Sequence, residues 1–359
     1  MQPFTYEGQP SRALFGAGAA ARLKDEIAAL GCSRALFCCT PGRAPAVEKI
    51  AATVDPLSAG LCAGALPFTP IEAAEAGRRT ARERAADCLV SYGGGNAVGL
   101  AKAIALEFEL PIIAIATTFS GSETTALQGI IREGARVQNA SPRMQARTLI
   151  YDPALTLDVP MEVLVPSGGN SMAHAVGALL AGNSNPVSRL YAEAGLRVLA
   201  AALARMARDP GDLDARGDAL YGAWLSASTL KLAAGVNIQH KLCHVLGGGY
   251  ALPHATVHTI ILPHATAYNR DAVPSAMRAI ARALGDEGAD APGAIFDLLA
   301  AIGAPTALRD IGLRREDLDA IADQVATDAY YSNPRPIERD AVRALLDDAW
   351  HGRRPGATG

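Results

Sequence analysis

The sequence lacks the features that mark a nucleic-acid-binding protein or a membrane protein. Its 33 Lys and Arg residues are outnumbered by 36 Asp and Glu residues, so the formal net charge is −3. It contains no basic block, whereas a nucleic-acid surface needs clustered Lys and Arg. No apolar run approaches the roughly 20 residues of a membrane-spanning helix. The opening stretch MQPFTYEGQP does not resemble a secretory signal. We therefore expect no nucleic-acid partner and no membrane.

The six cysteines form no CxxC pair and have no spacing typical of a disulfide framework. Several lie in apolar runs such as ALFCCT, where free thiols behave as small buried hydrophobes. Hydrophobic residues make up 50% of the chain and charged residues 19%, the balance of a well-packed soluble protein. A reducing cytoplasm is the expected location.

The first part of the chain alternates strand-like with helix-like segments. Short apolar runs predict strands over 34–40, 87–95 and 111–118, and helical patterns cover 70–86 and 96–108. A polar, hairpin-like section follows at roughly 124–150. Strands that alternate with helices predict a parallel sheet that is covered on both faces.

The pattern changes after about residue 157, where strand signals disappear. Long Ala- and Leu-rich segments such as 188–207 and 217–235 carry apolar residues at helical spacing. A chain of 359 residues suits two domains. We therefore expect an α/β domain over 1–157 and an all-helical domain over 158–359.

A glycine-rich turn, SYGGGNAVGLAK (91–102), joins a predicted strand to a predicted helix. Gly93, Gly94 and Gly95 allow the backbone to approach a ligand, and the N–H groups at the helix start, including that of Asn96, favour a phosphate. The turn is not the GxGxxG fingerprint of dinucleotide-binding folds. Taken alone, it is equally well explained as a tight strand-to-helix turn.

A second polar loop, ATTFSGSETT (116–125), follows the next predicted strand. Its hydroxyl groups, which include those of Thr117, Thr118, Ser120 and Ser122, suit sugar and phosphate oxygens. Because the two loops follow neighbouring strands, together they favour a cofactor crevice over an ordinary turn.

Histidines are concentrated in three short apolar segments. His240 and His244 lie four residues apart, as do Asn170 and His174, so each pair shares one face of a helix. His254 follows a glycine-rich bend that can return the chain to the same place. Imidazoles serve both as metal ligands and as acid/base groups, so either kind of shared site fits.

Three further histidines are assigned lesser roles. His258, one helical turn after His254, is expected to support the site from behind. His264 and His351 are expected to be structural or surface residues.

Several motifs in this order resemble the iron-containing alcohol dehydrogenase family. They are GGGNAVGLAKAIA, TTFSGSE, LIYDPALT, GGNSMAHAVGAL and HKLCHVLGGGYALPHATVHTIILPHATAYN. The resemblance implies a dehydroquinate synthase-like fold, in which a nucleotide-binding α/β domain precedes an all-helical domain. It also implies a homodimer and an active site in the cleft between the domains.

In this family a metal is held by one Asp and three His. Asn170 stands at the Asp position, and His174, His240 and His254 stand at the His positions; His244 matches a family histidine that approaches the nicotinamide. An amide carries no charge to offset a divalent cation, so we expect a vestigial metal site and no metal requirement. Lys241 is typical of the branch that reduces maleylacetate, and with the histidines it is expected to form the catalytic set.

Cofactor choice depends on the turn after the first predicted strand. Family members that demand NAD place an Asp there, whereas this chain has Thr40, followed by Pro41, Gly42 and Arg43. With no carboxylate opposing a 2′-phosphate and Arg43 able to pair with it, we expect NADH to be used and NADPH to be tolerated.

The resemblance therefore implies NAD(P)H-dependent reduction of the C=C bond of maleylacetate, a dicarboxylate, to 3-oxoadipate in aromatic-compound catabolism. Lys241, the histidine set and, more weakly, Arg335 are the candidate cations for its carboxylates. The alternative for Lys241 is an ordinary solvated lysine. The strongest alternative is a metal-dependent dehydrogenase of an alcohol or hydroxy acid. A lyase of the dehydroquinate synthase type fits less well, and a cofactor-binding sensor is the non-enzyme alternative.

Overall fold

The computed structural model describes residues 4, 6, 8, 11–133, 135–232, 237–286, 290–327 and 332–356. They form two compact units, one over Gly8–Val159 and a second from Pro160 onward, to which Phe4 and Tyr6 also belong. The sequence-based boundaries placed Phe4 and Tyr6 in the first unit instead. No described helix has the length and apolar character needed to cross a membrane.

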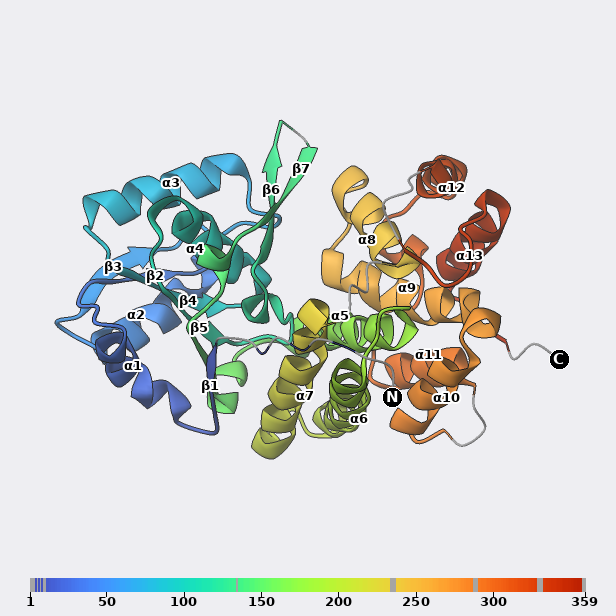
Figure 1. The fold of residues 1–359 in the computed structure, drawn as a ribbon, viewed down its shortest axis with the longest axis horizontal. Helices are drawn as coiled ribbons and strands as arrows, with labels where there is room; N and C mark the ends of the chain where they lie inside the picture. Colours follow the sequence, from blue (N-terminus) through green and yellow to red (C-terminus); the bar gives the residue numbers. More distant parts are fainter. Residues whose placement is uncertain are drawn as a thin grey trace. The chain divides into compact units, whose positions relative to one another are not determined.

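The first unit is built on a six-stranded parallel sheet (Figure 1) with the order β1-β8-β5-β4-β2-β3. The strands are β1 (Arg12–Phe15), β2 (Ala35–Cys38), β3 (Ser58–Cys62), β4 (Cys88–Gly93), β5 (Ile112–Ala116) and β8 (Thr148–Tyr151). The three strands predicted from apolar runs are confirmed as β2, β4 and β5. β1, β3 and β8 were missed. β1 and β3 are short edge strands that are only partly buried. β8 is buried, but it begins inside the section that the sequence analysis assigned to a hairpin.

Helices cover both faces of this sheet, as the alternation of segments predicted. They are α1 (Leu23–Ala29), α2 (Ala44–Ala52), α3 (Ile71–Glu83) and α4 (Gly95–Phe108). Side chains alternate along a strand, so Ala35 and Phe37 of β2 share one core with Ile27 of α1 and Val47 of α2. On the other face α3 packs against α4. The expected hairpin is present as the antiparallel pair β6 (Leu127–Arg132) and β7 (Ala135–Ala140).

The strand order contains one point at which the direction of winding reverses. From β2 the chain continues outward to β3, and from β4 it continues the opposite way to β5. β2 and β4 are neighbours, so the loops that follow them flank a switch point, where open α/β sheets bind their ligands.

In its described residues the second unit contains helices and no strand, as the spacing of apolar residues predicted. The core that links α8, α9, α12 and α13 includes Leu242, Ile261, Ile321 and Leu346. Helix α9 packs against both α5 and α8, so these three helices are neighbours in the unit. The helices are α5 (Met161–Leu180), α6 (Pro186–Arg208), α7 (Leu213–Leu232), α8 (Ile238–Gly249), α9 (His254–Tyr268), α10 (Pro274–Ala283), α11 (Ala291–Ala301), α12 (Leu318–Thr327) and α13 (Arg339–His351).

Candidate functional site

The two predicted polar loops lie against each other in the first unit. A Cβ atom added to Gly94 would stand 2.5 Å from Oγ1 of Thr118, and one added to Gly95 would stand 3.7 Å from Oγ of Ser120. Gly93 has φ +141°, a conformation that side chains rarely adopt. Close packing of the loop after β4 against the loop after β5 therefore requires glycine at position 94, and the backbone conformation favours it at position 93.

Helix α4 begins at the end of the glycine loop. The residue before it, Gly94, has no side chain to cap the first N–H groups of the helix. Such N–H groups carry the positive end of the helix dipole and are a natural phosphate site. Asn96 and the hydroxyl residues Thr117 and Ser122 lie in the same two loops, so the residues present fit a nucleotide diphosphate.

The loop after β2 lies at the same edge of the sheet. In this loop Arg43 is already paired with a carboxylate, which the sequence analysis did not foresee. Nη2 of Arg43 donates to Oδ1 of Asp158 at 2.8 Å, and the guanidinium lies 5.6 Å from the centre of the Tyr92 ring. Burial opposes the charge, yet the hydrogen bond and charge of Asp158 raise the pKa of Arg43. The sequence analysis found no carboxylate beside Arg43, because Asp158 lies far along the sequence and only the fold brings the two together.

A buried lysine anchors the hydroxyl loop to α4, and the sequence analysis did not identify it. Nζ of Lys102 donates to the Ser122 carbonyl at 2.7 Å, to Thr125 Oγ1 at 3.0 Å and to the Leu127 carbonyl at 2.8 Å. Burial lowers the pKa of Lys102 to about 7, and the charge of Glu123 opposes that shift. Its place in the motif GGGNAVGLAK was the available signal.

In the second unit the predicted histidines come together from α5, α8 and α9. Ring centres lie 5.9 Å apart for His174 and His240, and 5.0 Å apart for His240 and His258. The distances are 4.6 Å for His254 and His258, and 6.4 Å for His244 and His254. The grouping of the five histidines that the sequence analysis singled out is therefore observed.

Burial makes part of this cluster neutral. His174 is 8% exposed, and burial, followed by the charges of His240 and His254, lowers its pKa to about 3. Burial, followed by the other four histidines, also lowers the pKa of His258 well below its ordinary value. The expectation that the whole histidine set supplies positive charge is therefore wrong for these two residues.

The neutral form of His258 is fixed by Gln239. The amide nitrogen of Gln239 donates to the backbone carbonyl of His258 at 2.8 Å, which sets the orientation of the amide. The same nitrogen lies 3.3 Å from Nδ1 of His258, so Nδ1 accepts and the ring proton stays on Nε2. Gln239 thus favours the Nε2–H tautomer of His258, the histidine that was expected to support the site from behind.

Two family models together match nearly the whole chain. Residues 10–153 match iron-containing alcohol dehydrogenase, and residues 164–350 match the C-terminal part of the Fe-containing alcohol dehydrogenase family. The chain belongs to the iron-containing alcohol dehydrogenase family. The resemblance drawn from the motifs is thereby confirmed.

Its relatives include maleylacetate reductases. The chain is 45% identical to the maleylacetate reductase of Burkholderia cepacia, with 99% of this chain and 100% of that protein covered. A Ralstonia eutropha JMP134 structure described as an alcohol dehydrogenase aligns with TM-score 0.97 and 50% identity over 99% of this chain and 100% of that one. The maleylacetate reductase structure from Agrobacterium tumefaciens aligns with TM-score 0.93 and 41% identity, with the same coverage.

The family name implies iron, but the donor set of this chain lacks the carboxylate that the resemblance places beside the three histidines. Asn170, 6% exposed on α5, offers an uncharged amide where a carboxylate would balance the cation. Among the described residues, three His, Cys, Asp or Glu ligand atoms lie within 4.8 Å of one another only at Cys32, Asp87 and Cys88 in the other unit.

Lys241 is buried rather than solvated. It is 1% exposed on α8, which also carries His240 and His244. The alternative in which Lys241 is an ordinary surface lysine is therefore wrong. Its place on α8, one residue after His240, makes it a candidate to bind a carboxylate of the substrate.

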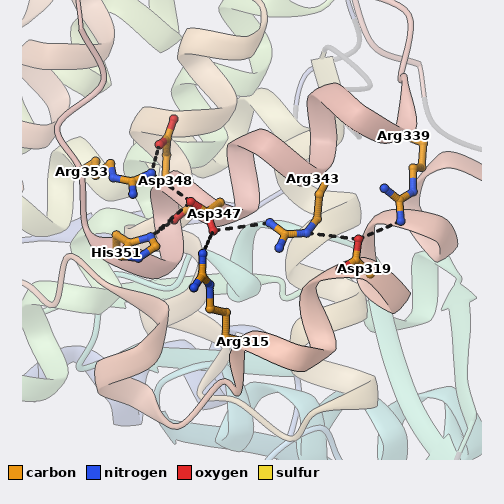
Figure 2. Close-up of polar contacts among 8 residues, drawn as sticks. All are labelled: Arg315, Asp319, Arg339, Arg343, Asp347, Asp348, His351 and Arg353. Atoms are coloured by element: carbon orange, nitrogen blue, oxygen red, sulfur yellow. Dashed lines mark hydrogen bonds and ion pairs between the residues drawn. The ribbon is translucent and has the colours of Figure 1, made fainter.

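The remaining candidate residues, His264, His351 and Arg335, make contacts with other side chains of the helical unit. His264 is buried against Phe296, and burial lowers its pKa to about 4. His351 belongs to the ion-pair network of α12 and α13 (Figure 2), in which its ring nitrogen lies 3.3 Å from Oδ2 of Asp347. Arg335 stacks on Tyr268 at 4.4 Å, which accounts for its position without a substrate.

Proposed function

We propose that this chain uses NADH to reduce the carbon–carbon double bond of maleylacetate, giving 3-oxoadipate. One observation carries the proposal: Asn170 replaces the anionic ligand in a three-histidine set, in a chain 45% identical to a maleylacetate reductase. In a metal-dependent alcohol dehydrogenase the metal polarises a carbonyl. An activated double bond conjugated to a ketone needs only hydrogen-bond donors and a cation where negative charge develops.

The first unit supplies a binding site for the cofactor. The N–H groups at the start of α4 would hold its diphosphate, and Thr118 and Ser120 offer hydroxyl groups beside Gly94 and Gly95. Lys102 fixes the loop that carries these hydroxyls. The bound cofactor supplies the hydride.

The second unit supplies the groups that act on the substrate. Maleylacetate is a dianion, and Lys241 is a buried cation on the same helix as His240 and His244. Hydride addition leaves negative charge on the ketone oxygen, which imidazole N–H groups stabilise by hydrogen bonding. The half-buried histidines His240, His244 and His254 are the proposed donors of the proton that completes the product.

The direct test is consumption of NADH in the presence of maleylacetate, with the product identified as 3-oxoadipate by mass spectrometry. One equivalent of NADH should be oxidised for each product molecule. Simple alcohols with NAD⁺, or aldehydes with NADH, should give turnover slower by at least about a hundredfold, equivalent to about 2.8 kcal/mol. Comparable turnover with these substrates would favour the metal-dependent dehydrogenase, and no turnover with any of them would favour the cofactor-binding sensor.

The dimer expected from the resemblance and the cytoplasmic location expected from the cysteines remain predictions. Sedimentation of the purified chain would test the first.

A further inference from the structure

Arg43 and Asp158 form an ion pair beside the switch point of the sheet. Arg43 ends the turn that follows β2, and Asp158 follows β8 near the end of the first unit. Their atoms Nη2 and Oδ1 are 2.8 Å apart, and the side chains are 21% and 60% exposed, respectively. Solvent therefore reaches the carboxylate more readily than the guanidinium.

The guanidinium is also fixed from the β4 side. It lies over the ring of Tyr92, 5.6 Å from the ring centre, and Tyr92 immediately precedes the glycine loop. Arg43 thus connects the loop after β2 with the strand that carries the proposed diphosphate site. In doubly wound folds the turn at this side of the crevice contacts the adenosine ribose, and an Arg there accommodates a 2′-phosphate.

We propose that Asp158 sets the cofactor preference of this chain toward NADH by engaging Arg43 and by opposing a 2′-phosphate. This inference rests on the proposed use of a nicotinamide cofactor. NADPH carries an additional dianionic phosphate on the ribose, whereas NADH has a hydroxyl group there. The Asp158 carboxylate competes with the 2′-phosphate for the Arg43 guanidinium, and it also repels the phosphate. It therefore acts against NADPH and not against NADH.

The effect of Asp158 on cofactor selectivity can be measured, because removing its charge should leave the fold intact. Partly exposed ion pairs contribute little to stability, so Asp158→Asn should fold like the wild type. A freed Arg43 can bind phosphate through two parallel N–H bonds, the stronger arrangement. Selectivity, rather than folding, is therefore the property that the substitution should change.

The experiment compares Asp158→Asn with the wild type, with Arg43→Met and with the double variant. The kcat/KM ratio of NADPH to NADH should rise about tenfold in Asp158→Asn, which corresponds to about 1.4 kcal/mol. The increase should vanish in the double variant, because the guanidinium that binds the phosphate is gone. Asp297→Asn is the matched control: its partner Arg354 also lies at 2.8 Å and its exposure is 57%, so the cofactor ratio should stay at the wild-type value.

A binding measurement separates this inference from the proposed reaction. Calorimetric titration with adenosine 2′,5′-bisphosphate and with 5′-AMP requires no substrate and no turnover. Asp158→Asn should strengthen binding of the bisphosphate relative to 5′-AMP, again by about tenfold. If the ratio does not change, or if the gain persists in the double variant, the inference is wrong. Failure to reduce maleylacetate would overturn the proposed function and leave this result intact.

Discussion

At the scale of single residues, the candidate site is defined by charge. Asn170 stands where the family places an anion, while His174 and His258 are buried and neutral. The sequence predicted which histidines gather, because spacing of four residues fixes a helix face. It could not predict their ionisation or the burial of Lys241, since both depend on how α5, α8 and α9 pack.

Restoring the anion at position 170 should create a metal site. Asn170→Asp supplies a carboxylate beside three imidazoles, the donor set that balances a divalent cation. We expect zinc to bind the variant at least about tenfold more tightly than the wild type, or about 1.4 kcal/mol. Calorimetric titration of metal-stripped protein measures this. Asn170→Ala is the control and should gain nothing; equal affinity in all three proteins would contradict the account of the donor set.

Removing the charge of Lys241 should impair the reaction with its dianionic substrate. Lys241→Met keeps much of the stem and removes the ammonium group. We expect kcat/KM for maleylacetate to fall at least tenfold, or about 1.4 kcal/mol, with the affinity for NADH nearly unchanged. Lys49→Met, which alters an exposed lysine of α2, is the matched control. A folded Lys241→Met variant with wild-type kcat/KM would remove this lysine from the mechanism.

At the scale of elements, the loops that follow β2, β4 and β5 carry the proposed cofactor site. Their glycine and hydroxyl residues could be predicted as a site, because open α/β sheets bind ligands at the carboxyl ends of their parallel strands. The contacts of Lys102 with Ser122 and Leu127, and that of Arg43 with Asp158, were not. These contacts join residues that are far apart in the sequence, so no helix or strand periodicity reveals them.

Lys102 should make the stability of the first unit depend on pH. Its pKa is about 7 in the folded protein and near 10.4 when unfolded, so between these values the unfolded chain binds the additional proton. Stability contributed by this group therefore rises with pH across that window and is constant below it. Compared with Lys102→Met, the wild type should gain up to about 1.4 kcal/mol per pH unit between pH 7.5 and 9.5 in urea unfolding. A constant difference across that range would show that Lys102 keeps an ordinary pKa.

At the scale of the whole molecule, the chain divides its chemistry between two units. The α/β unit carries the diphosphate loops and the helical unit carries the histidines and Lys241. Fold class followed from the sequence because alternating and helical periodicities are distinct over long stretches. Loss of the carboxylate at position 170 then separates this chain chemically from a metal-dependent dehydrogenase built on the same fold.

The most direct test of this account is maleylacetate reduction by protein that has been stripped of metal with a chelator. Metal content is confirmed by mass spectrometry, and kcat/KM with NADH is measured before and after iron or zinc is returned. The account predicts that the stripped protein keeps its activity and that neither metal raises it more than about twofold, roughly 0.4 kcal/mol. Loss of turnover on stripping, with recovery when iron or zinc is added, would contradict it.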